Sequence, residues 1–273
     1  MNFIDKLLGV TRNNKSLLCV GLDPDPKLMP LKLSVFEFNR EIIDATSDLV
    51  CAYKPNLAFY EALGIEGLKA LEKTIAHIPE GIPIIGDAKR GDIASSSEAY
   101  ARALFETFGF DAATVNPYLG HDSVAPFIAY ADKGVFILCK TSNAGSADFQ
   151  ESLCAEASAS NTRPLFELVA LKAREWDTQG NIGLVVGATF PEQLRRVREL
   201  CPELPLLIPG IGAQGGDLAA VVKYGVDVSG EKAIINCSRQ IIYASKGKDF
   251  AQAARREALK LRDQINEQLA TRR

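Results

Sequence analysis

The 273-residue sequence lacks the features that define several large classes of protein. It has only two histidines, His77 and His121, too few for a histidine-based metal cage. None of its six cysteines belongs to a C-x-x-C pair, and four fall in apolar runs typical of strands, so we interpret them as buried free thiols. No apolar run approaches the roughly 18 residues of a membrane span. Asp5 and Lys6 stand where a secretory signal needs apolar residues, and we therefore expect a cytosolic protein.

The charge balance also excludes general attraction to polyanions. Lysine and arginine total 31 against 34 aspartates and glutamates, which gives a net charge of −3. A chain with this balance has no electrostatic preference for nucleic acid or for an anionic membrane, so we expect neither partner. Any anionic ligand must then be held by a local site. The length and the 47% hydrophobic content are typical of one large domain that needs no disulfide or metal to stabilise it.

Short apolar runs rich in β-branched residues alternate with amphipathic helical patterns along the chain. Continuous apolar character indicates strands buried on both faces of a sheet. Eight such units in about 250 residues are typical of a (β/α)8 TIM barrel, so we predict this α/β fold, as a single domain over residues 1–273. A doubly wound open sheet is the alternative, but no G-x-G-x-x-G follows the first strand. The predicted strands are 17–22, 50–54, 83–87, 112–116, 135–140, 182–187, 204–208 and 233–237.

Several helices carry recognisable start signals. Ser34-x-x-Glu37 is a capping-box pattern, and Ser95-x-x-Glu98 predicts a second start of the same kind. Pro164 suits the first turn of a helix, and residues 250–269 form a last amphipathic pattern. The gap between the fifth and sixth strands is long and contains a small, polar stretch. We interpret it as an insertion after strand 5.

Charged residues cluster where the second and third predicted strands end. Asp87 and Lys89 are two residues apart and so point to the same side of a strand, while Asp92 follows in the loop and Lys54 closes the neighbouring strand. In a barrel the carboxyl ends of the strands carry the active site, so these four groups are candidate catalytic residues. The alternative is a solvated ion network in which Asp92 caps the next helix.

A glycine-rich loop, P-G-I-G-A-Q-G-G-D, follows the seventh predicted strand at residues 209–217. Loops after strands 7 and 8 of such barrels usually bind phosphate through backbone N–H groups that glycines such as Gly210 and Gly212 leave accessible. Arg239, after strand 8, offers a guanidinium to the same anion. The alternative is that these glycines only form turns.

Eight segments at strand ends, in order along the chain, resemble the orotidine 5'-phosphate decarboxylase family in its longer bacterial form, the type 2 subfamily. They run from near residue 20 to near residue 245, so the resemblance covers most of the chain. The matching segments are V-G-L-D-P-D (20–25), Y-K-P-N (53–56), D-A-K-R-G-D-I (87–93), V-N-P-Y-L-G (115–120), K-T-S-N (140–143), V-V-G-A-T (185–189), P-G-I-G-A-Q-G-G-D (209–217) and N-C-S-R (236–239).

The resemblance implies a role for each matching position. Lys54, Asp87 and Lys89 correspond to the family's charged array, and Asp92 to the member that the other subunit of a homodimer contributes. This chain departs from the family pattern at Ala94, at Ser96, and at Ala144 where proline often follows the asparagine. The implied substrate contacts are Asp23 to the ribose, Ser142 to the pyrimidine, Gln214 and Arg239 to the phosphate, and Ile93 and Ser96 across the subunit interface.

The implied reaction is the decarboxylation of orotidine 5'-phosphate to UMP and CO2, the last step of de novo pyrimidine nucleotide synthesis. Lys89 would stabilise the carbanion at C6 and then protonate it. The sequence has no pyridoxal, thiamine or metal pattern, so we expect no cofactor and no metal. The substrate would be a small nucleotide, bound in sites that the two subunits share.

Three other functions compete with this interpretation. A metal-dependent sugar-phosphate lyase of the same superfamily would need an acidic ligand where this chain has Lys54. A Schiff-base aldolase using Lys54, Lys89 or Lys140 is disfavoured because lysines flanked by aspartates stay charged. A non-catalytic phosphate-binding barrel would bind UMP without turning anything over.

Overall fold

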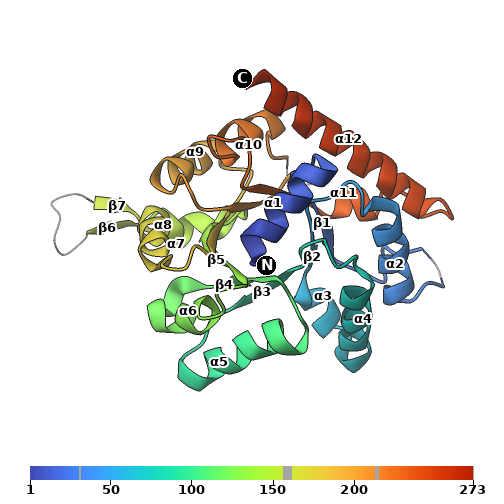
Figure 1. Cartoon of the computed structure of the whole chain (residues 1–273), viewed down its shortest axis with the longest axis horizontal. Coiled ribbons are helices and arrows are strands. Elements are labelled where there is room, and N and C mark those ends of the chain that lie inside the picture. Colours follow the sequence, from blue (N-terminus) through green and yellow to red (C-terminus); the bar gives the residue numbers. More distant parts are fainter. Residues whose placement is uncertain (31, 156–161, 213–214, 273) are drawn as a thin grey trace.

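The computed structural model describes residues 1–30, 32–155, 162–212 and 215–272, and within them eight parallel strands form one curved sheet (Figure 1). The strand order is β2-β1-β10-β9-β8-β5-β4-β3, and isolated bridges from Tyr53 to Ile84 and from Asn56 to Asp87 join the two edges. The sheet is therefore a closed barrel, which confirms the predicted fold. The barrel strands are β1 (Leu18–Leu22), β2 (Ala52–Pro55), β3 (Ile85–Arg90), β4 (Ala112–Val115), β5 (Gly134–Lys140), β8 (Ile182–Val186), β9 (Leu206–Pro209) and β10 (Ala233–Cys237).

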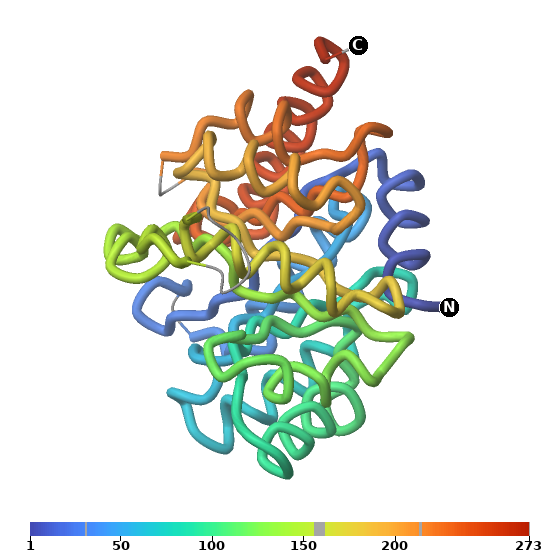
Figure 2. The backbone as a smooth tube through the Cα atoms, turned by 90° about the vertical axis from the view of Figure 1, so that its left-hand side faces the viewer, coloured from blue at the N-terminus to red at the C-terminus, as the bar shows by residue number. Residues whose placement is uncertain are grey.

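Helices connect successive strands and cover the outside of the barrel (Figures 1 and 2). Apolar side chains on their inner faces pack against outward-facing strand residues such as Val20, Val135 and Ile235. The longer helices are α1 (Phe3–Asn14), α2 (Val35–Thr46), α4 (Gly64–His77), α5 (Ala94–Arg102), α6 (His121–Ile128), α8 (Leu165–Trp176), α9 (Pro191–Leu200), α10 (Leu218–Gly225) and α12 (Phe250–Thr271). The short ones are α3 (Leu57–Glu61), α7 (Ala147–Gln150), α11 (Arg239–Ile242), the π-helix η1 (Ala103–Thr107) and the 3-10 turns η2 (Pro117–Leu119) and η3 (Ala144–Ser146).

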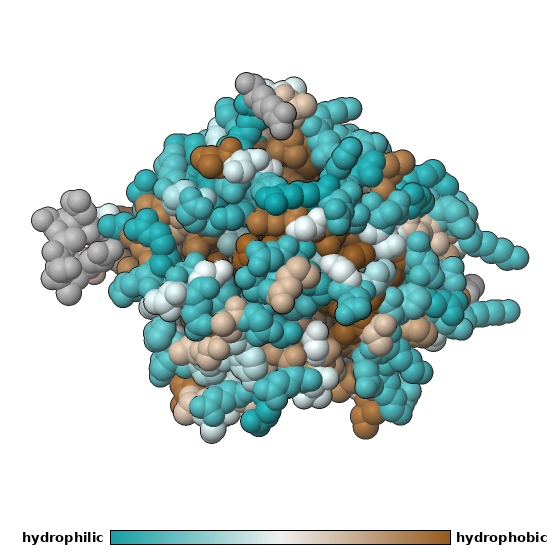
Figure 3. All heavy atoms as spheres, in the orientation of Figure 1, coloured by the Kyte–Doolittle hydropathy of each residue, from teal (hydrophilic) through white to brown (hydrophobic). Residues whose placement is uncertain are grey.

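A second apolar cluster fills the inside of the barrel and contains one residue from each strand. Helix α1 crosses the amino-terminal end of the barrel, where Phe3 packs edge-on against Phe136 with ring centroids 5.7 Å apart (Figure 1). This end is therefore plugged, and side chains on its surface are mostly polar (Figure 3). The strand residues of the cluster are Cys19, Ala52, Ile85, Ala112, Phe136, Val185, Leu207 and Ile234.

A helix follows each of the three predicted start signals, but two of these helices do not begin at the predicted residue. Ser34 and Glu37 form the predicted capping box. At the second predicted start the prediction was wrong by two residues: Ile93, not Ser95, is the N-cap, and its carbonyl accepts the Ser96 N–H in the first turn of a helix that begins at Ala94. Pro164 also lies just before its helix, because it pairs with Leu153 in an antiparallel ladder.

The predicted insertion after strand 5 is present. It contains η3, α7 and the paired short strands β6 (Leu153–Ala155) and β7 (Thr162–Pro164). In Figure 2 the part of the chain just after β5, coloured yellow-green, projects on the side opposite α1. The insertion therefore adjoins the carboxyl-terminal end of the barrel.

All six cysteines lie within the described residues and are free thiols. Five are buried, as predicted, whereas Cys154 on β6 is partly exposed. No helix in the described ranges is both long enough and apolar enough to cross a membrane.

Arg198, near the end of α9, joins several segments at the amino-terminal end of the barrel. Its guanidinium donates hydrogen bonds to the carbonyl oxygens of Leu204 (2.7 Å), Gly225 and Lys232, and also to those of Cys201 and Pro202. These carbonyls belong to the loops around β9, α10 and β10. One side chain thus supplies hydrogen bonds to five carbonyl oxygens of these loops; of these, the Lys232 carbonyl also accepts the Leu206 N–H.

We expect Arg198→Met to lower the free energy of unfolding by about 3 kcal/mol, because several partly buried carbonyls lose their donor at once. Urea unfolding followed by circular dichroism measures the change. Arg195→Met is the matched control, since Arg195 on the same helix bonds only exposed glutamates, and we expect a change below about 0.5 kcal/mol. Equal effects of the two substitutions would contradict the role of Arg198.

Candidate active site

The strand alternation that fills the barrel interior also places polar side chains at its carboxyl-terminal end. Lys54 lies two residues after Ala52, Asp87 two after Ile85, Thr114 two after Ala112 and Asn236 two after Ile234. Because side chains two apart on a strand share a face, these polar groups point along the barrel axis above the apolar plug. All four line one cavity of about 510 Å³.

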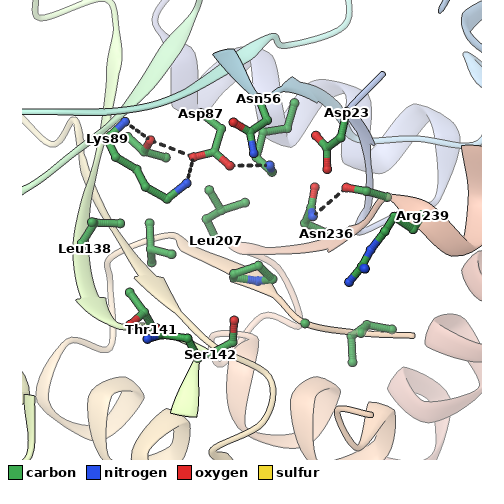
Figure 4. A pocket seen from close by; sticks show the side chains of 18 of the residues that line it. Asp23, Asn56, Asp87, Lys89, Leu138, Thr141, Ser142, Leu207, Asn236 and Arg239 are labelled. Carbon is green, nitrogen blue, oxygen red and sulfur yellow. Dashed lines mark hydrogen bonds and ion pairs between the residues drawn. The ribbon is translucent and has the colours of Figure 1, made fainter. Parts of the chain in front are cut away.

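Asp87 lies between two lysines (Figure 4). Its Oδ2 is 2.8 Å from the Lys54 Nζ and its Oδ1 is 2.5 Å from the Lys89 Nζ. The side chains of Lys54 and Asp87 are only 5% and 11% exposed, whereas that of Lys89 is 49% exposed. The array is thus anchored in the barrel at Lys54 and opens into the cavity at Lys89.

The pKa values of the buried pair shift so as to keep both groups charged. Burial opposes a charge on Lys54, but the carboxylates of Asp87 and Asp23 and the hydrogen bond that Lys54 donates to Asp87 raise the pKa of this ammonium above its ordinary value. Burial likewise opposes the charge on Asp87, but Lys54 and Lys89 lower the pKa of that carboxyl well below its usual range. At neutral pH both members of the buried Lys54–Asp87 pair are therefore charged.

Thr114 fixes the backbone of Lys89 as well as the carboxylate. Its hydroxyl accepts the Lys89 N–H at 2.9 Å and donates to the Asp87 Oδ1 at 3.1 Å. Lys89 has φ +49°, and the register between β3 and β4 shifts between Gly86 and Arg90. A non-glycine residue at positive φ is strained and persists only when its surroundings hold it, which Thr114 does here.

The cavity brings together seven of the residues singled out in the sequence. In Figure 4, Lys89 and Arg239 lie on opposite sides of it, with Ser142 on a third side. The seven are Asp23, Lys54, Asp87, Lys89, Ser142, Gly210 and Arg239. Sequence reasoning gave no role to the other lining residues, although several of them fall in the segments that carry the family resemblance. They are Asn56, Phe59, Thr114, Leu138, Thr141, Asn143, Val185, Leu207, Pro209, Ile211, Asn236, Ser238 and Gln240.

The other predicted site residues that the structure describes, Asp92, Ile93, Ser96 and Gly212, do not line this cavity. Asp92 accepts the N–H of Ile93 (2.8 Å), and both Ile93 and Ser96 are exposed at the start of α5. Asp92 does not cap that helix, so the alternative that gave it a capping role was wrong. Gly212 lies in the loop after β9 with φ +87°, and an added Cβ there would lie 2.3 Å from the Gln240 Oε1. Gln214 lies outside the described residues.

Asp23 brings a second carboxylate to the cavity. Its Oδ1 is buried and has no hydrogen-bond partner among the residues that the structure describes, so it is available to a ligand hydroxyl. The loop is held from outside the cavity: the Tyr243 hydroxyl donates to the Asp23 carbonyl at 2.8 Å and accepts the Asp25 N–H at 2.6 Å. The Tyr60 hydroxyl donates to the Leu22 carbonyl.

The donor set of the cavity does not suit a metal ion. No group of three or more histidine, cysteine, aspartate or glutamate side chains lies together for a metal within the residues that are described. Both carboxylates of the cavity, Asp23 and Asp87, also interact with the Lys54 ammonium, which repels a cation. The arrangement instead favours an anionic ligand, with cations at Lys89 and Arg239.

The fold and this site define the class of protein: a (β/α)8-barrel enzyme that binds an anionic ligand beside a lysine–aspartate–lysine array. Residues 16–256 match the orotidine 5'-phosphate decarboxylase / HUMPS family. The chain belongs to this family.

Individual relatives agree with the family match over nearly the whole chain. An orotidine 5'-phosphate decarboxylase of Dehalococcoides mccartyi is 56% identical over 266 residues, which are 97% of this chain and 98% of that protein. The structure of Leishmania donovani OMP decarboxylase is 41% identical with a TM-score of 0.85, covering 98% of this chain and 99% of that one. Leishmania donovani UMP synthase is 43% identical with a TM-score of 0.88; the match covers 98% of this chain but only 57% of that one.

The Asp87 pairs make a pH-dependent contribution to stability. Because the pKa of Asp87 is lowered on folding, its ion pairs stabilise the protein above the ordinary aspartate pKa, and this stabilisation is lost as the pH falls toward the folded-state value. At pH 7, Asp87→Asn should lower the free energy of unfolding by roughly 3 kcal/mol, because Lys54 stays buried without its partner. The difference from wild type should shrink toward pH 3.

Urea unfolding at a series of pH values measures this difference. Asp263→Asn is the control, because Asp263 forms only an exposed pair with Arg262 and should show little change at any pH. A difference for Asp87→Asn that stays constant or grows toward pH 3 would contradict an ionised Asp87 in the folded protein.

Proposed function

We propose that this chain is a cytoplasmic enzyme that decarboxylates orotidine 5'-phosphate to UMP and CO2, the last step of de novo pyrimidine nucleotide synthesis. One observation carries the proposal: a Lys54–Asp87–Lys89 array, buried at Lys54 and Asp87, opens at Lys89 into a cavity of about 510 Å³, in a chain 56% identical to a curated orotidine 5'-phosphate decarboxylase. Such a volume is in the range of small-molecule sites. Free, mostly buried thiols support a reducing compartment.

In the proposed mechanism the array stabilises a carbanion. The bond from C6 to the carboxylate breaks, CO2 leaves, and the electron pair stays on C6. The Lys89 ammonium lies beside this developing charge, which is electrostatic stabilisation by a preorganised cation. Lys89 then donates a proton to C6 and is reprotonated from solvent. Asp87 and Lys54 keep Lys89 in place and charged.

The remaining predicted residues bind the parts of the substrate remote from C6. Arg239 binds the phosphate together with backbone N–H groups of the loop that contains Gly210 and Gly212, and Gln214 assists it. The unpaired Oδ1 of Asp23 accepts a ribose hydroxyl, a role that its burial supports. Ser142 contacts the pyrimidine. Binding energy from the phosphate then helps to order the reacting ring.

We also infer a homodimer whose subunits share their active sites. Asp92 lies outside its own cavity, and Ile93 beside it is 59% exposed. The loops after β3 and β4 are packed together at Gly91, and the second loop exposes Tyr118 and Leu119. Apolar side chains exposed together around a charged residue are typical of an interface. Asp92, Ile93 and Ser96 would then complete the partner's site.

Two rival functions remain testable. If the chain were a metal-dependent sugar-phosphate lyase, EDTA would abolish its activity and magnesium would restore it. The Lys54 ammonium argues against this function, because it stands where such a lyase needs an acidic metal ligand. For a non-catalytic phosphate-binding barrel, UMP would bind but the absorbance of orotidine 5'-phosphate would not fall on mixing with the purified chain.

Lys89→Ala should reduce the turnover of orotidine 5'-phosphate by about 10⁴-fold or more, because it removes both the stabilising cation and the proton donor. The absorbance assay measures the loss. The folded structure should persist, since the Lys89 side chain is 49% exposed. Lys260→Ala, at an exposed position on α12, is the control and should turn over normally. Near-normal turnover by Lys89→Ala would remove Lys89 from the mechanism.

Mixing two inactive variants tests the shared site. Lys89→Ala and Asp92→Ala should each be nearly inactive alone, but after subunit exchange about half of the dimers are hybrids, and each hybrid has one intact site. Roughly a quarter of all sites should therefore recover. Mixing Lys89→Ala with Asp87→Ala is the control: both groups come from one chain, so no hybrid site is intact. No recovery in the first mixture would show that Asp92 does not act across the dimer.

A further inference from the structure

Lys140, the last residue of β5, is a buried cation that the mechanism does not use. The register between β5 and β8 shifts between Leu138 and Lys140, so the inward alternation ends there. The Lys140 side chain is 0% exposed. Its Nζ lies 2.7 Å from the Ser146 Oγ, 3.0 Å from the Glu151 Oε1 and 4.1 Å from the centre of the Phe190 ring. A buried ammonium is costly unless it is paired and hydrogen-bonded in this way. Lys140 therefore anchors residues 144–151, which we call the α7 segment, beneath the end of β5.

Gln150, at the end of the α7 segment, fixes the first residue after β5. Its Oε1 accepts the Thr141 N–H at 2.9 Å, and its Nε2 donates to the Thr141 Oγ1 at 2.8 Å. The Thr141 hydroxyl in turn donates to the Asn143 Oδ1 at 2.7 Å. One amide side chain thus determines both the backbone and the rotamer of a residue that lines the cavity.

Ser142, next along the chain, is held from its other side. Thr189 donates its hydroxyl to the Ser142 carbonyl at 3.2 Å. A Cβ added at Gly187 would lie 2.7 Å from the Ser142 Cα, so the loop after β8 packs directly against this residue. The main chain of Ser142 is therefore confined between the two loops. Its side chain lines the cavity, on a different side from Arg239 (Figure 4).

We propose that the α7 segment is a base-recognition element, in which Gln150 is a positioning residue that presents Ser142 to the pyrimidine and Lys140 anchors the segment. This inference rests on the proposed function, since it takes the pyrimidine to lie against Ser142. The segment contacts the wall formed by residues 141–143, and among the described residues no hydrogen bond or ion pair joins it to Arg239. Its loss should therefore weaken binding of the base and leave binding of the ribose phosphate unchanged.

A comparison of UMP with ribose 5-phosphate, which lacks the base, tests whether the α7 segment affects binding of the base alone. In isothermal titration with the full chain, Gln150→Ala should weaken UMP binding by about tenfold, the size expected for misplacing one hydrogen-bonding group, and leave ribose 5-phosphate within about twofold. Lys140→Met should show the same selectivity. Gln179→Ala is the control, because the Gln179 amide donates only to the Ile128 carbonyl, far from the cavity. Equal weakening of both ligands, or no weakening of UMP, would overturn the inference.

A double variant tests whether Gln150 acts through Ser142. If it does, Gln150→Ala should weaken UMP binding by less than about twofold when added to Ser142→Ala, since the group it positions is already absent. Additive losses would overturn the positioning role. Failure of the proposed function would appear differently, as a wild-type chain that does not turn over orotidine 5'-phosphate.

Discussion

The carboxylate of Asp87 binds one ammonium with each of its oxygens, and the chemistry of the site depends on this arrangement. Without Asp87, burial would favour a neutral Lys54, and Lys89 would lose the group that holds it over the cavity. With it, Lys89 is held as a fixed cation, and in the mechanism we propose it faces the carbon at which a carbanion forms. The positive charge is then in position before the substrate arrives, so little reorganisation is needed during the reaction.

The ion pair between Lys54 and Asp87 links β2 to β3, the two edge strands that meet where the barrel closes. Among the described residues, the backbones of these strands are joined only by isolated bridges, one of which pairs Asn56 with Asp87. Lys54 on β2 and Asp87 on β3 are 2.8 Å apart. Closure of the barrel therefore brings the two groups together, and their attraction supports the closure. Thr114 extends this support to the next strand.

The sequence predicts the strands and much of the cavity because both follow simple periodic rules. Apolar runs locate the barrel strands, and the strand-end rule locates Lys54 and Asp87. The same inward alternation could have located Thr114 and Asn236, had it been extended by one step on each strand. The alternation could not predict where the Lys140 side chain points, because the register shifts at the end of β5 and this side chain, unlike that of Leu138, does not line the cavity. The role we propose for Asp92 requires a second subunit, so neither the periodicity of the sequence nor the structure of a single chain can test it.

A crystal structure of the chain with UMP bound would show whether Lys89 faces C6 of the nucleotide. We expect the Lys89 Nζ within about 4 Å of C6 of the uracil, the phosphate hydrogen-bonded to Arg239 and the base edge against Ser142, with Asp92 of the partner subunit beside Lys89. UMP bound with C6 away from Lys89, or with its phosphate away from Arg239, would rule out the roles proposed for these two residues.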